Sequence, residues 1–246
     1  VNGIRAVEKK SFIPWLLDSN ADVVCIQETK ANPSQLSEEL LSPAGYKAYF
    51  SSAKKAGYSG TAIYSKKEPN SIITLGIPEF DDEGRTTVAI FGDLVVISAY
   101  FPNSQDAGAR LPYKLAFCDA ILEFCNKLVS EGKNIVLCGD YNIAHTPIDI
   151  NHPERQKGVS GFLPEERDWV TEFLESGMID TFRVFDQRAE QYSWWSYRFN
   201  SRSRNAGWRI DYHMVSEPLR DKLTNADIWQ HVVHSDHCPI FVELTL

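Results

Sequence analysis

Side chains that could bind a metal ion or move a proton follow or precede three apolar segments of the chain. They are Glu28 after Val23–Ile26, Asp140 and Asn142 after Ile135–Cys138, and Asp236 and His237 before Pro239–Val242. Short apolar segments of this kind are typical of buried β-strands, so we expect these side chains at the exposed rim of a sheet. Acids and a histidine gathered there predict one metal-dependent site.

The acidic residues suit different chemistry. Glu28 is of the type that binds Mg²⁺, which takes a few carboxylate oxygens and keeps its remaining waters; capping of the helix expected after Pro33 is the alternative. Asp140 and Asn142 share one side of an extended segment, because alternate residues point the same way. One could polarise a water while the other holds it. An Asx turn is the alternative for this pair.

His237 adds a titratable imidazole, and Asp211 is a carboxylate that could fix its tautomer and raise its pKa. A protonated His237 would bind a phosphate oxygen, whereas an ordinary surface histidine is the alternative. Tyr100 and Asn103 place a hydroxyl and an amide after another apolar segment. A proline turn with a core tyrosine is the alternative there.

Residues 183–209 combine aromatic and basic side chains, with six arginines against two acidic residues in a chain of net charge −8. A basic segment on an acidic protein suits a face that meets phosphate. Trp194 could stack on a nucleobase or sugar, while we expect Trp195 to pack in the core. Arg202 and Arg204 are flanked by hydroxyl and amide side chains, which weakens the alternative of an ordinary solvated loop.

Helix and strand patterns interleave along the whole chain, which favours an α/β or α+β fold over an all-β one. Apolar periodicity predicts helices over 7–17, 34–41, 111–128 and 163–174. It predicts strands over 22–26, 46–50, 60–64, 86–91, 94–100, 134–138, 193–197, 209–215 and 240–244, with a hairpin turn at Gly92-Asp93. The polar segment 144–161 is long enough to be a functional loop.

The composition predicts one domain with a deep core, because the 246 residues are 43% hydrophobic and contain no linker-like segment. No apolar stretch approaches the ~18 residues of a membrane span. Five cysteines occur without a Cys-x-x-Cys pair. Free, buried thiols in a reducing cytosol are therefore expected.

A series of motifs in order resembles the exonuclease III family of abasic-site endonucleases, in particular a bacterial member, over nearly the whole chain. The motifs are Gln27–Lys30, Tyr100–Asn103, Gly139–His145, Gly161–Arg167, Gly207–Tyr212 and Ser235–Pro239, together with Trp194-Trp195. The resemblance implies a DNase I-like, four-layered α/β sandwich in which two mixed sheets pack face to face with helices outside.

The resemblance also implies Mg²⁺- or Mn²⁺-dependent cleavage of the phosphodiester 5′ to an abasic site, leaving a 3′-hydroxyl. It implies 3′-phosphodiesterase and variable 3′–5′ exonuclease activity as well. The expected partner is double-stranded DNA with an abasic site or a blocked 3′ end. We expect a monomeric DNA repair enzyme in the cytoplasm.

Roles for individual residues are implied by their positions in these motifs. Glu28 resembles the main metal ligand, with Asn2 and Asp236 in or near the metal shell. Asp140 resembles the residue that activates the water, and Asn142 the residue that orients it. The phosphate-binding group resembles His237 paired with Asp211, together with Tyr100 and Asn103. Trp194, Trp208 and Ile210 resemble the apolar pocket for a flipped abasic sugar, and Arg198 and Phe199 stand where relatives insert side chains into the DNA groove.

Two features depart from the family pattern. Relatives have an asparagine two residues before the position of Asn2, at the end of a first strand, so we expect a strand upstream of Val1. Gln156 and Val159 stand where relatives have phosphate-contacting asparagines.

Other activities share this superfamily, which includes DNase I-like nucleases, inositol-polyphosphate phosphatases and sphingomyelinases, so fold alone does not fix the substrate. The tryptophan-containing segments favour abasic DNA over a phospholipid or inositide. A predominantly 3′–5′ exonuclease paralogue and a non-catalytic DNA-binding module are the remaining alternatives. The latter would be expected to have lost a catalytic residue, yet Glu28, Asp140 and His237 are all present.

Overall fold

The chain forms two compact units. The computed structural model describes residues 1–246, apart from the side chain of Asp106. The first unit comprises Val1–Tyr100 and Leu137–Gly139, and the second comprises Phe101–Val136 and Asp140–Leu246. Strand β7 (Asn134–Asp140) therefore contributes residues to both units. That the chain is one domain stays a prediction.

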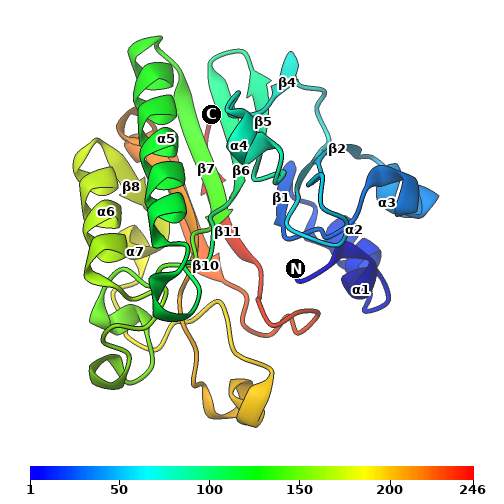
Figure 1. Ribbon diagram of the computed structural model, residues 1–246. Helices are drawn as coiled ribbons and strands as arrows, with labels where there is room; N and C mark the ends of the chain where they lie inside the picture. Colours follow the sequence, from blue (N-terminus) through cyan, green and yellow to red (C-terminus); the bar gives the residue numbers. More distant parts are fainter. The chain divides into compact units, whose positions relative to one another are not determined.

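The first unit contains short helices and antiparallel strands (Figure 1). The helices are α1 (Ile4–Glu8), α2 (Phe12–Ser19), α3 (Glu38–Leu41) and α4 (Pro78–Asp81). The strands are β1 (Val23–Gln27), β2 (Lys47–Ser51), β3 (Thr61–Ser65), β4 (Ser71–Ile73), β5 (Thr86–Phe91) and β6 (Leu94–Tyr100). β3 pairs with both β1 and β2, and β5 pairs with both β4 and β6.

Two layers of strands pack against each other within the first unit, and polar side chains are bonded between them. Gln27 Nε2 donates to Ser98 Oγ at 3.0 Å, and the hydroxyls of Thr61 and Thr87 lie 2.8 Å apart. Because alternate residues of a strand face opposite sides, Tyr64 of β3 faces away from Thr61. Its side packs on the first helices in a core of Ile4, Phe12, Leu16, Val24 and Leu40.

The second unit holds the longest helix and the C-terminal strands. Its helices are α5 (Leu111–Ser130), α6 (Pro164–Glu175) and α7 (Thr181–Phe185), and its strands are β8 (Met178–Asp180), β9 (Asp211–Ser216), β10 (Leu223–Ile228) and β11 (Ile240–Leu244). β8 pairs with β9 and β10 pairs with β11, both antiparallel. α5 contacts α6, α7 contacts β9 and β10, and β11 contacts β9.

Short 3₁₀ helices connect these elements. They are η1 (Pro33–Gln35), η2 (Asp106–Gly108), η3 (Pro147–Asp149), η4 (Pro153–Arg155), η5 (Arg198–Asn200), η6 (Arg202–Arg204) and η7 (Glu217–Lys222).

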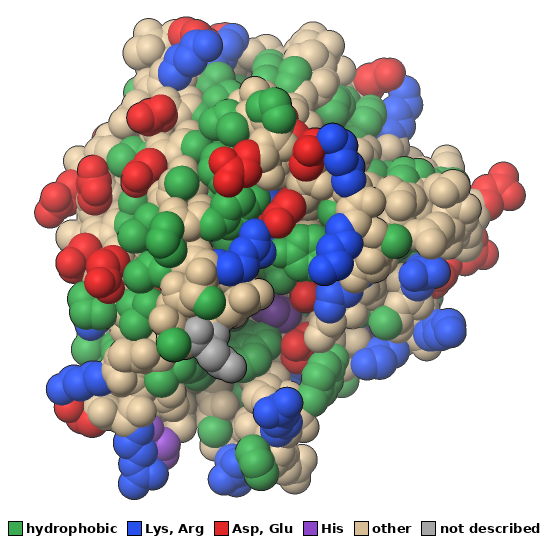
Figure 2. Space-filling model, in the orientation of Figure 1, with side chains coloured by type: hydrophobic (Ala, Val, Ile, Leu, Met, Phe, Trp, Pro, Cys, Tyr) green, Lys and Arg blue, Asp and Glu red, His purple; other side chains and the backbone are tan. Residues whose placement is uncertain are grey.

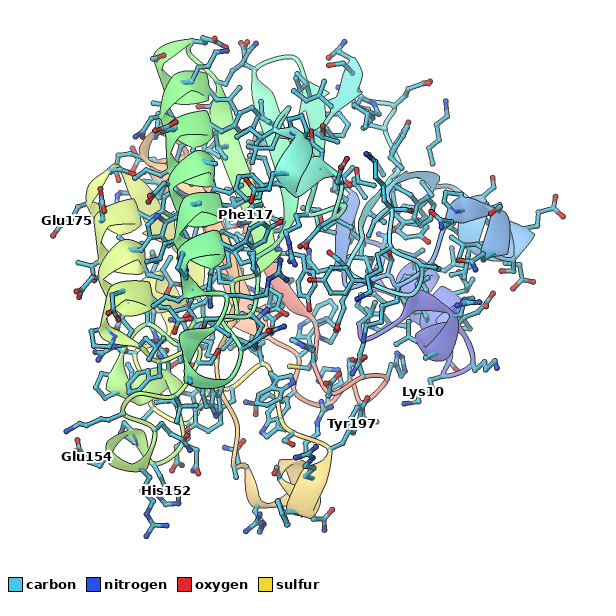
Figure 3. The ribbon with its side chains drawn as sticks, viewed as in Figure 1. Lys10, Phe117, His152, Glu154, Glu175 and Tyr197 are labelled. Atoms are coloured by element: carbon cyan, nitrogen blue, oxygen red, sulfur yellow. The ribbon has the colours of Figure 1, made fainter. Side chains whose placement is uncertain are left out.

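An aromatic stack forms part of the core of the second unit. Phe101 stacks on Tyr141 with ring centroids 4.2 Å apart and meets Phe117 edge to face at 5.0 Å. Phe117 belongs to α5 and is labelled in Figure 3. Phe101 lies two residues before Asn103, and Tyr141 follows Asp140 directly. Because protein interiors are close-packed, this stack holds the start of both polar segments in place.

Most of the predicted elements are confirmed, including α5, β7 and the β5–β6 hairpin, which closes at Phe91 and Leu94. The single helix over 7–17 is wrong, because the chain turns at Ser11 (φ 66°) and separates α1 from α2. The strand over 193–197 is also wrong. Trp194 forms isolated bridges with Trp208 and His237, so the aromatic pattern there reflects side-chain packing rather than a ladder. β4, β8, β10, α4 and α7 were not predicted.

The cysteines and the helices of the described residues bear on two further predictions. The five cysteines are free thiols, and all except Cys25 are buried. In the part of the chain that the structure describes, no helix combines the length and apolar character needed to cross a membrane.

Candidate active site

Asp140, Asp211 and His237 lie together in the second unit. Asp140 ends β7 and Asp211 begins β9, while His237 lies just before β11. His237 Nδ1 is 2.9 Å from Asp211 Oδ2, and His237 Nε2 is 3.7 Å from Asp140 Oδ2. The imidazole is therefore placed between two carboxylates. Because the side chains are at most 13% exposed, water and salt screen these charges only weakly.

The two carboxylates keep His237 protonated. Burial alone would lower its pKa, but the charges of Asp211 and Asp140 and the hydrogen bond to Asp211 raise it to about 9. The ligand atoms of the three residues lie within 4.8 Å of one another, a spacing that would also suit a metal ion. A protonated imidazole has no lone pair for a metal, however, and donates from both nitrogens. The group is better suited to bind a phosphate oxygen.

Asn142 fixes one oxygen of Asp140. Its backbone N–H donates to Asp140 Oδ1 at 2.9 Å, which is the Asx turn that the sequence allowed. Its side-chain amide donates to Phe101 O at 3.0 Å and accepts from Asn103 Nδ2 at 3.2 Å. The predicted partners Asp140, Asn142 and Asn103 are thus brought together, with the second Asp140 oxygen directed toward His237.

Asp236 is held by neutral donors beside this group. Trp194 Nε1 donates to Asp236 Oδ2 at 3.2 Å, and Ser235 Oγ donates to Asp236 Oδ1 at 2.8 Å. Burial raises the pKa of Asp236, but the charge of His237 and the bond from Ser235 outweigh it and lower the pKa. Asp236 is therefore a carboxylate at neutral pH. Its role as a metal ligand stays a prediction.

Trp194, Trp208 and Ile210 form an apolar cluster next to His237. The two indoles meet edge to face with centroids 6.1 Å apart, and the Trp194 ring lies 6.5 Å from the His237 ring. Ile210 packs in the same cluster. Trp195 is buried in a separate core group, as predicted, whereas Trp194 is only partly buried. The three predicted pocket residues are therefore adjacent to the acid–imidazole group.

Ser193 is a site residue that the sequence did not reveal. Its hydroxyl donates to Asp211 Oδ2 at 2.6 Å and accepts from the backbone N–H groups of Ile210 and Asp211, each at 3.1 Å. It therefore fixes the carboxylate that orients His237. A single serine in an aromatic segment gives no pattern that predicts such a contact.

The segment Arg198–Arg204, called the tip below, projects from the second unit. Its residue Phe199 is 85% exposed and has a left-handed backbone (φ 57°). Arg204 is also exposed and donates to Phe199 O at 2.8 Å. Figure 2 shows basic and hydrophobic side chains at this tip. An exposed phenylalanine beside arginines is consistent with the predicted groove contacts of Arg198, Phe199 and Arg204.

Arg202 is held differently, although it belongs to the same segment. Its guanidinium donates to the backbone carbonyls of Ser235, Gln230 and Val232 at 2.7–3.0 Å. It also lies 4.4 Å from the centre of the Trp195 ring. The predicted DNA contact of Arg202 stays a prediction. Arg202 supports the chain just before Asp236.

Arg209 also has a structural environment rather than a surface one. It is 1% exposed and pairs with Asp149 and Asp180, each at 2.7 Å. The excess of arginines in residues 183–209 therefore overstates the basic charge available to a ligand.

Asn2 and Glu28 meet in the first unit. Both side-chain oxygens converge on the ammonium group of Lys30, which lies 2.7 Å from Asn2 Oδ1 and 3.0 Å from Glu28 Oε1. An amide and a carboxylate oxygen around one cation are the ligand types that suit Mg²⁺ or Mn²⁺. The residues therefore fit a divalent metal, with the Lys30 ammonium in the place of a cation.

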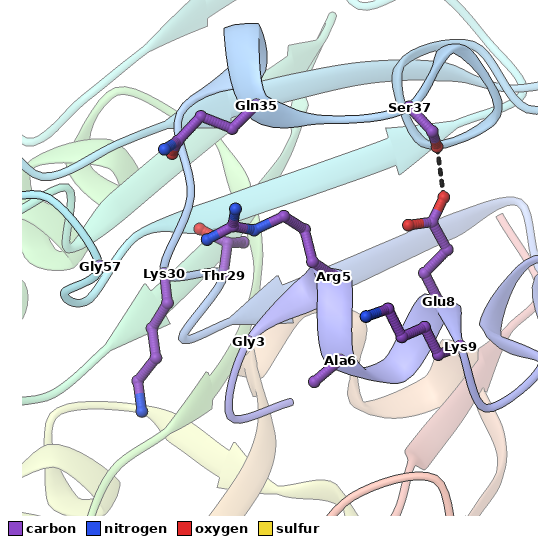
Figure 4. A pocket seen from close by; sticks show the side chains of 10 residues that line it. All are labelled: Gly3, Arg5, Ala6, Glu8, Lys9, Thr29, Lys30, Gln35, Ser37 and Gly57. Atoms are coloured by element: carbon purple, nitrogen blue, oxygen red, sulfur yellow. Dashed lines mark hydrogen bonds between the residues drawn. The ribbon is translucent and has the colours of Figure 1, made fainter.

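A groove of about 680 Å³ lies beside Lys30 in the first unit (Figure 4). Arg5 of α1 and Lys9, which follows α1, line it together with Thr29, and Ser37 at its rim is hydrogen-bonded to Glu8. Three basic side chains on one groove provide a surface that can attract phosphate.

Tyr100 ends β6 in the first unit and is partly buried. The guanidinium of Arg85 lies 5.2 Å from the centre of its ring and donates to its carbonyl at 2.9 Å. Neither contact tests the predicted role of Tyr100 in phosphate binding, which stays a prediction.

Comparisons with known proteins cover almost the whole chain. Residues 1–237 match the model of the endonuclease/exonuclease/phosphatase family. An exodeoxyribonuclease of Bacillus subtilis is 42% identical over 243 residues, which are 98% of this chain and 95% of that protein. A DNA-(apurinic or apyrimidinic site) endonuclease of Dictyostelium discoideum is 38% identical over an alignment of 250 positions that covers 100% of this chain and 69% of that protein.

A solved structure of an AP endonuclease from Archaeoglobus fulgidus has a TM-score of 0.87 at 27% identity and covers 100% of this chain and 97% of its own. This likeness confirms the α/β fold class predicted from the sequence.

Proposed function

Because the chain belongs to the endonuclease/exonuclease/phosphatase family, we propose that it is a DNA repair nuclease that cleaves the phosphodiester 5′ to abasic sites in duplex DNA. The cleavage leaves a 3′-hydroxyl, and the same centre removes groups that block 3′ ends. The observation that carries the proposal is the placement of His237 between Asp140 and Asp211, next to the apolar cluster of Trp194 and Trp208.

Asp140 is proposed as the general base. Its Oδ1 accepts from the backbone N–H of Asn142, and we assign the water to Oδ2, the oxygen directed toward His237. The water oxygen bonds to phosphorus as the bond from phosphorus to the 3′ oxygen breaks, and one water proton passes to Asp140. The leaving 3′ oxygen keeps the electron pair of the broken bond and takes a proton from solvent to become the 3′-hydroxyl.

His237 is proposed to bind a non-bridging oxygen of the phosphate. Its Nδ1–H is directed to Asp211, which leaves Nε2–H as the donor. A fixed cationic donor stabilises the charge that develops at phosphorus in the transition state.

A divalent metal, Mg²⁺ or Mn²⁺, is proposed as the cofactor, and Asn2 and Glu28 would hold it. When bound, such an ion neutralises charge on phosphate oxygens. Lys30 already holds the two side-chain oxygens together.

Abasic specificity is proposed to come from the cluster of Trp194, Trp208 and Ile210. An abasic sugar presents an apolar ring without a base, and a base-bearing nucleotide would overfill a small apolar site. The tip would hold the distorted duplex through Arg198, Phe199 and Arg204.

A predominantly 3′–5′ exonuclease is the second candidate, and the similarity to the Bacillus exodeoxyribonuclease favours it. Both activities would use the same Asp140 and His237. They differ in whether an internal abasic site is accepted. For either activity we propose a monomer located in the cytoplasm.

A substrate panel tests the proposal. Labelled duplexes would carry an internal tetrahydrofuran abasic analogue, no lesion, or a recessed 3′ end, each with Mg²⁺ and with EDTA. We expect Mg²⁺-dependent incision at the analogue. Digestion only from the recessed 3′ end would favour the exonuclease. If the protein neither incises the analogue nor digests the recessed 3′ end, both candidates are contradicted.

A further inference from the structure

Helices α5 and α6 each carry a charged residue on their buried, apolar side. Lys114 lies on the same side of α5 as Cys118 and Ile121, and Glu166 lies on the same side of α6 as Phe173. Both charged side chains are 0% exposed and form an ion pair at 2.7 Å. A buried ion pair often contributes no more to the free energy of unfolding than apolar residues of similar size. Its role is therefore sought in the other hydrogen bonds that Lys114 and Glu166 form.

Glu166 is bonded to two further segments of the second unit. Its Oε1 accepts from Ser104 Oγ at 2.7 Å, and its Oε2 accepts from the backbone N–H groups of Gly161 and Leu163 at 2.7 and 3.0 Å. The carboxylate therefore holds the segment that follows Asn103 and the segment that leads into α6.

Lys114 extends this network to the catalytic loop. Its ammonium donates to Asn142 O at 2.7 Å as well as to Glu166. Asn142 has a left-handed backbone (φ 50°), a conformation that is less favourable for residues other than glycine and needs support from its surroundings. The Lys114 bond supplies support on the carbonyl of Asn142.

A second route leads from the pair to the side chain of Asn142. Ser104 Oγ, which donates to Glu166, lies 2.6 Å from Ser160 Oγ, and Ser160 Oγ lies 3.1 Å from Asn103 Oδ1. Because a hydroxyl has one proton, Ser160 donates either to Ser104 or to Asn103 at any one time. Asn103 Nδ2 in turn donates to Asn142 Oδ1. Both the backbone and the amide of Asn142 are thus connected to the buried pair.

We propose that Lys114 and Glu166 are positioning residues, which fix Asn142 and Asn103 and through them the orientation of Asp140. The proposal rests on the function proposed above, in which Asp140 is the general base. Neither residue touches the substrate. The pair acts by holding the Asp140 carboxylate at the angle set by the Asn142 N–H bond.

The test compares the parent protein with three variants. Lys114→Met/Glu166→Gln removes both charges together, so that no unpaired buried charge is left. Lys114→Arg keeps a cationic donor. Ile121→Val, one helical turn or more from Lys114 on the same side of α5, is a packing control that leaves the network unchanged. Urea unfolding establishes that each variant is folded.

Two measurements distinguish positioning from stability. For the double variant we expect kcat for the abasic duplex to fall by about 10- to 100-fold, with KM changed by less than about twofold. We expect hydrogen exchange of the Asn142 amide to become faster relative to the core amide of Val215. Lys114→Arg should recover most of kcat, and Ile121→Val should change neither quantity.

The opposite results would overturn the proposal. An unchanged kcat with a protected Asn142 amide would show that the pair does not position the loop. An equal loss of kcat in Ile121→Val, at the same urea midpoint, would show that stability alone is responsible. If the parent protein cuts none of the substrates, the proposed function fails, and the Asn142 exchange rate alone then decides whether the pair positions the loop.

Discussion

The Asp140 centre and the tip, both in the second unit, are built in opposite ways. Around Asp140 and Asp211 the side chains are largely buried. The Asn142 N–H donates to Asp140, and Ser193 and His237 donate to Asp211. At the tip, Phe199 is 85% exposed and its backbone is left-handed. In the function we propose, the first region is pre-organised for the chemical step, and the second contacts a large and variable ligand.

Arg202 and Arg204 show the same contrast within one segment. Arg202 is directed inward onto three backbone carbonyls, whereas Arg204 is exposed. Two arginines two residues apart therefore have different environments, and a count of charges does not distinguish them.

Replacing His237 should have the largest effect among the variants that sharpen this comparison. His237→Gln keeps a donor of similar reach but removes the positive charge. We expect kcat for incision to fall by about 10²- to 10³-fold, the range for loss of a transition-state donor, with little change in duplex affinity. Single-turnover incision and a binding titration measure the two. A retained rate would show that the imidazolium is not used.

Asp211→Asn should have a smaller effect and a pH signature. Removing its charge takes away the main contribution that raises the pKa of His237. The parent's incision rate should decrease as the pH rises through about 9, and in the variant the decrease should begin at lower pH. We expect a loss of about 10- to 100-fold at neutral pH, as for other groups that orient a functional histidine. Identical pH profiles would contradict this coupling.

Stability should follow the same titration. The pKa of His237 is about 9 in the folded protein against 6.5 for an ordinary histidine. Its contribution to the free energy of unfolding is therefore fully present below pH 6.5 and is lost as the pH rises through 9. Urea unfolding of the parent and of Asp211→Asn between these values should show a steeper loss in the parent.

Arg204→Ala tests the tip and should alter binding rather than chemistry. Loss of one phosphate contact should weaken duplex binding several-fold and reduce the slope of log K against log salt by about 1. The single-turnover rate at saturating enzyme should stay the same. An unchanged salt slope would remove the tip from the DNA-binding surface.

Arg202→Ala should have the smallest effect on binding and instead reduce stability. Three backbone carbonyls lose a charged donor, so we expect the free energy of unfolding to fall by about 1–3 kcal/mol without a change in the salt slope. Arg204→Ala is the matched control, since it removes an exposed arginine of the same segment. A reduced salt slope in Arg202→Ala would restore the DNA contact predicted from the sequence.

Much of the Asp140 centre could be predicted from the sequence. A polar residue that directly follows or precedes a buried strand lies at the rim of the sheet. Asp140, Asp211 and His237 were therefore expected close together, and the structure brings them together. The strand predicted over residues 193–197 is wrong for a reason that local sequence does not contain. Trp194 pairs with Trp208 and His237, which are distant from it in sequence.

The supporting residues could be predicted less well. Ser193 acts through a contact with Asp211 that depends on the tertiary fold. Lys114 and Glu166 did leave a signal, since each is a charge within the apolar side of a helix, but the partner of a buried charge is not encoded by helical spacing. The burial of Arg209 likewise could not be predicted, because it depends on the positions of Asp149 and Asp180 in the folded chain.

The central claim, that Asp140 is the base, is tested most directly by measuring incision and binding of a tetrahydrofuran-containing duplex with Asp140→Asn in Mg²⁺. The variant keeps the size of the side chain and an oxygen that can accept from Asn142. We expect the single-turnover rate to fall by about 10²- to 10⁴-fold, as for loss of a general base, while the dissociation constant of the duplex stays within about twofold of the parent's. An Asp140→Asn protein that incises the duplex at the parent's rate would contradict the claim.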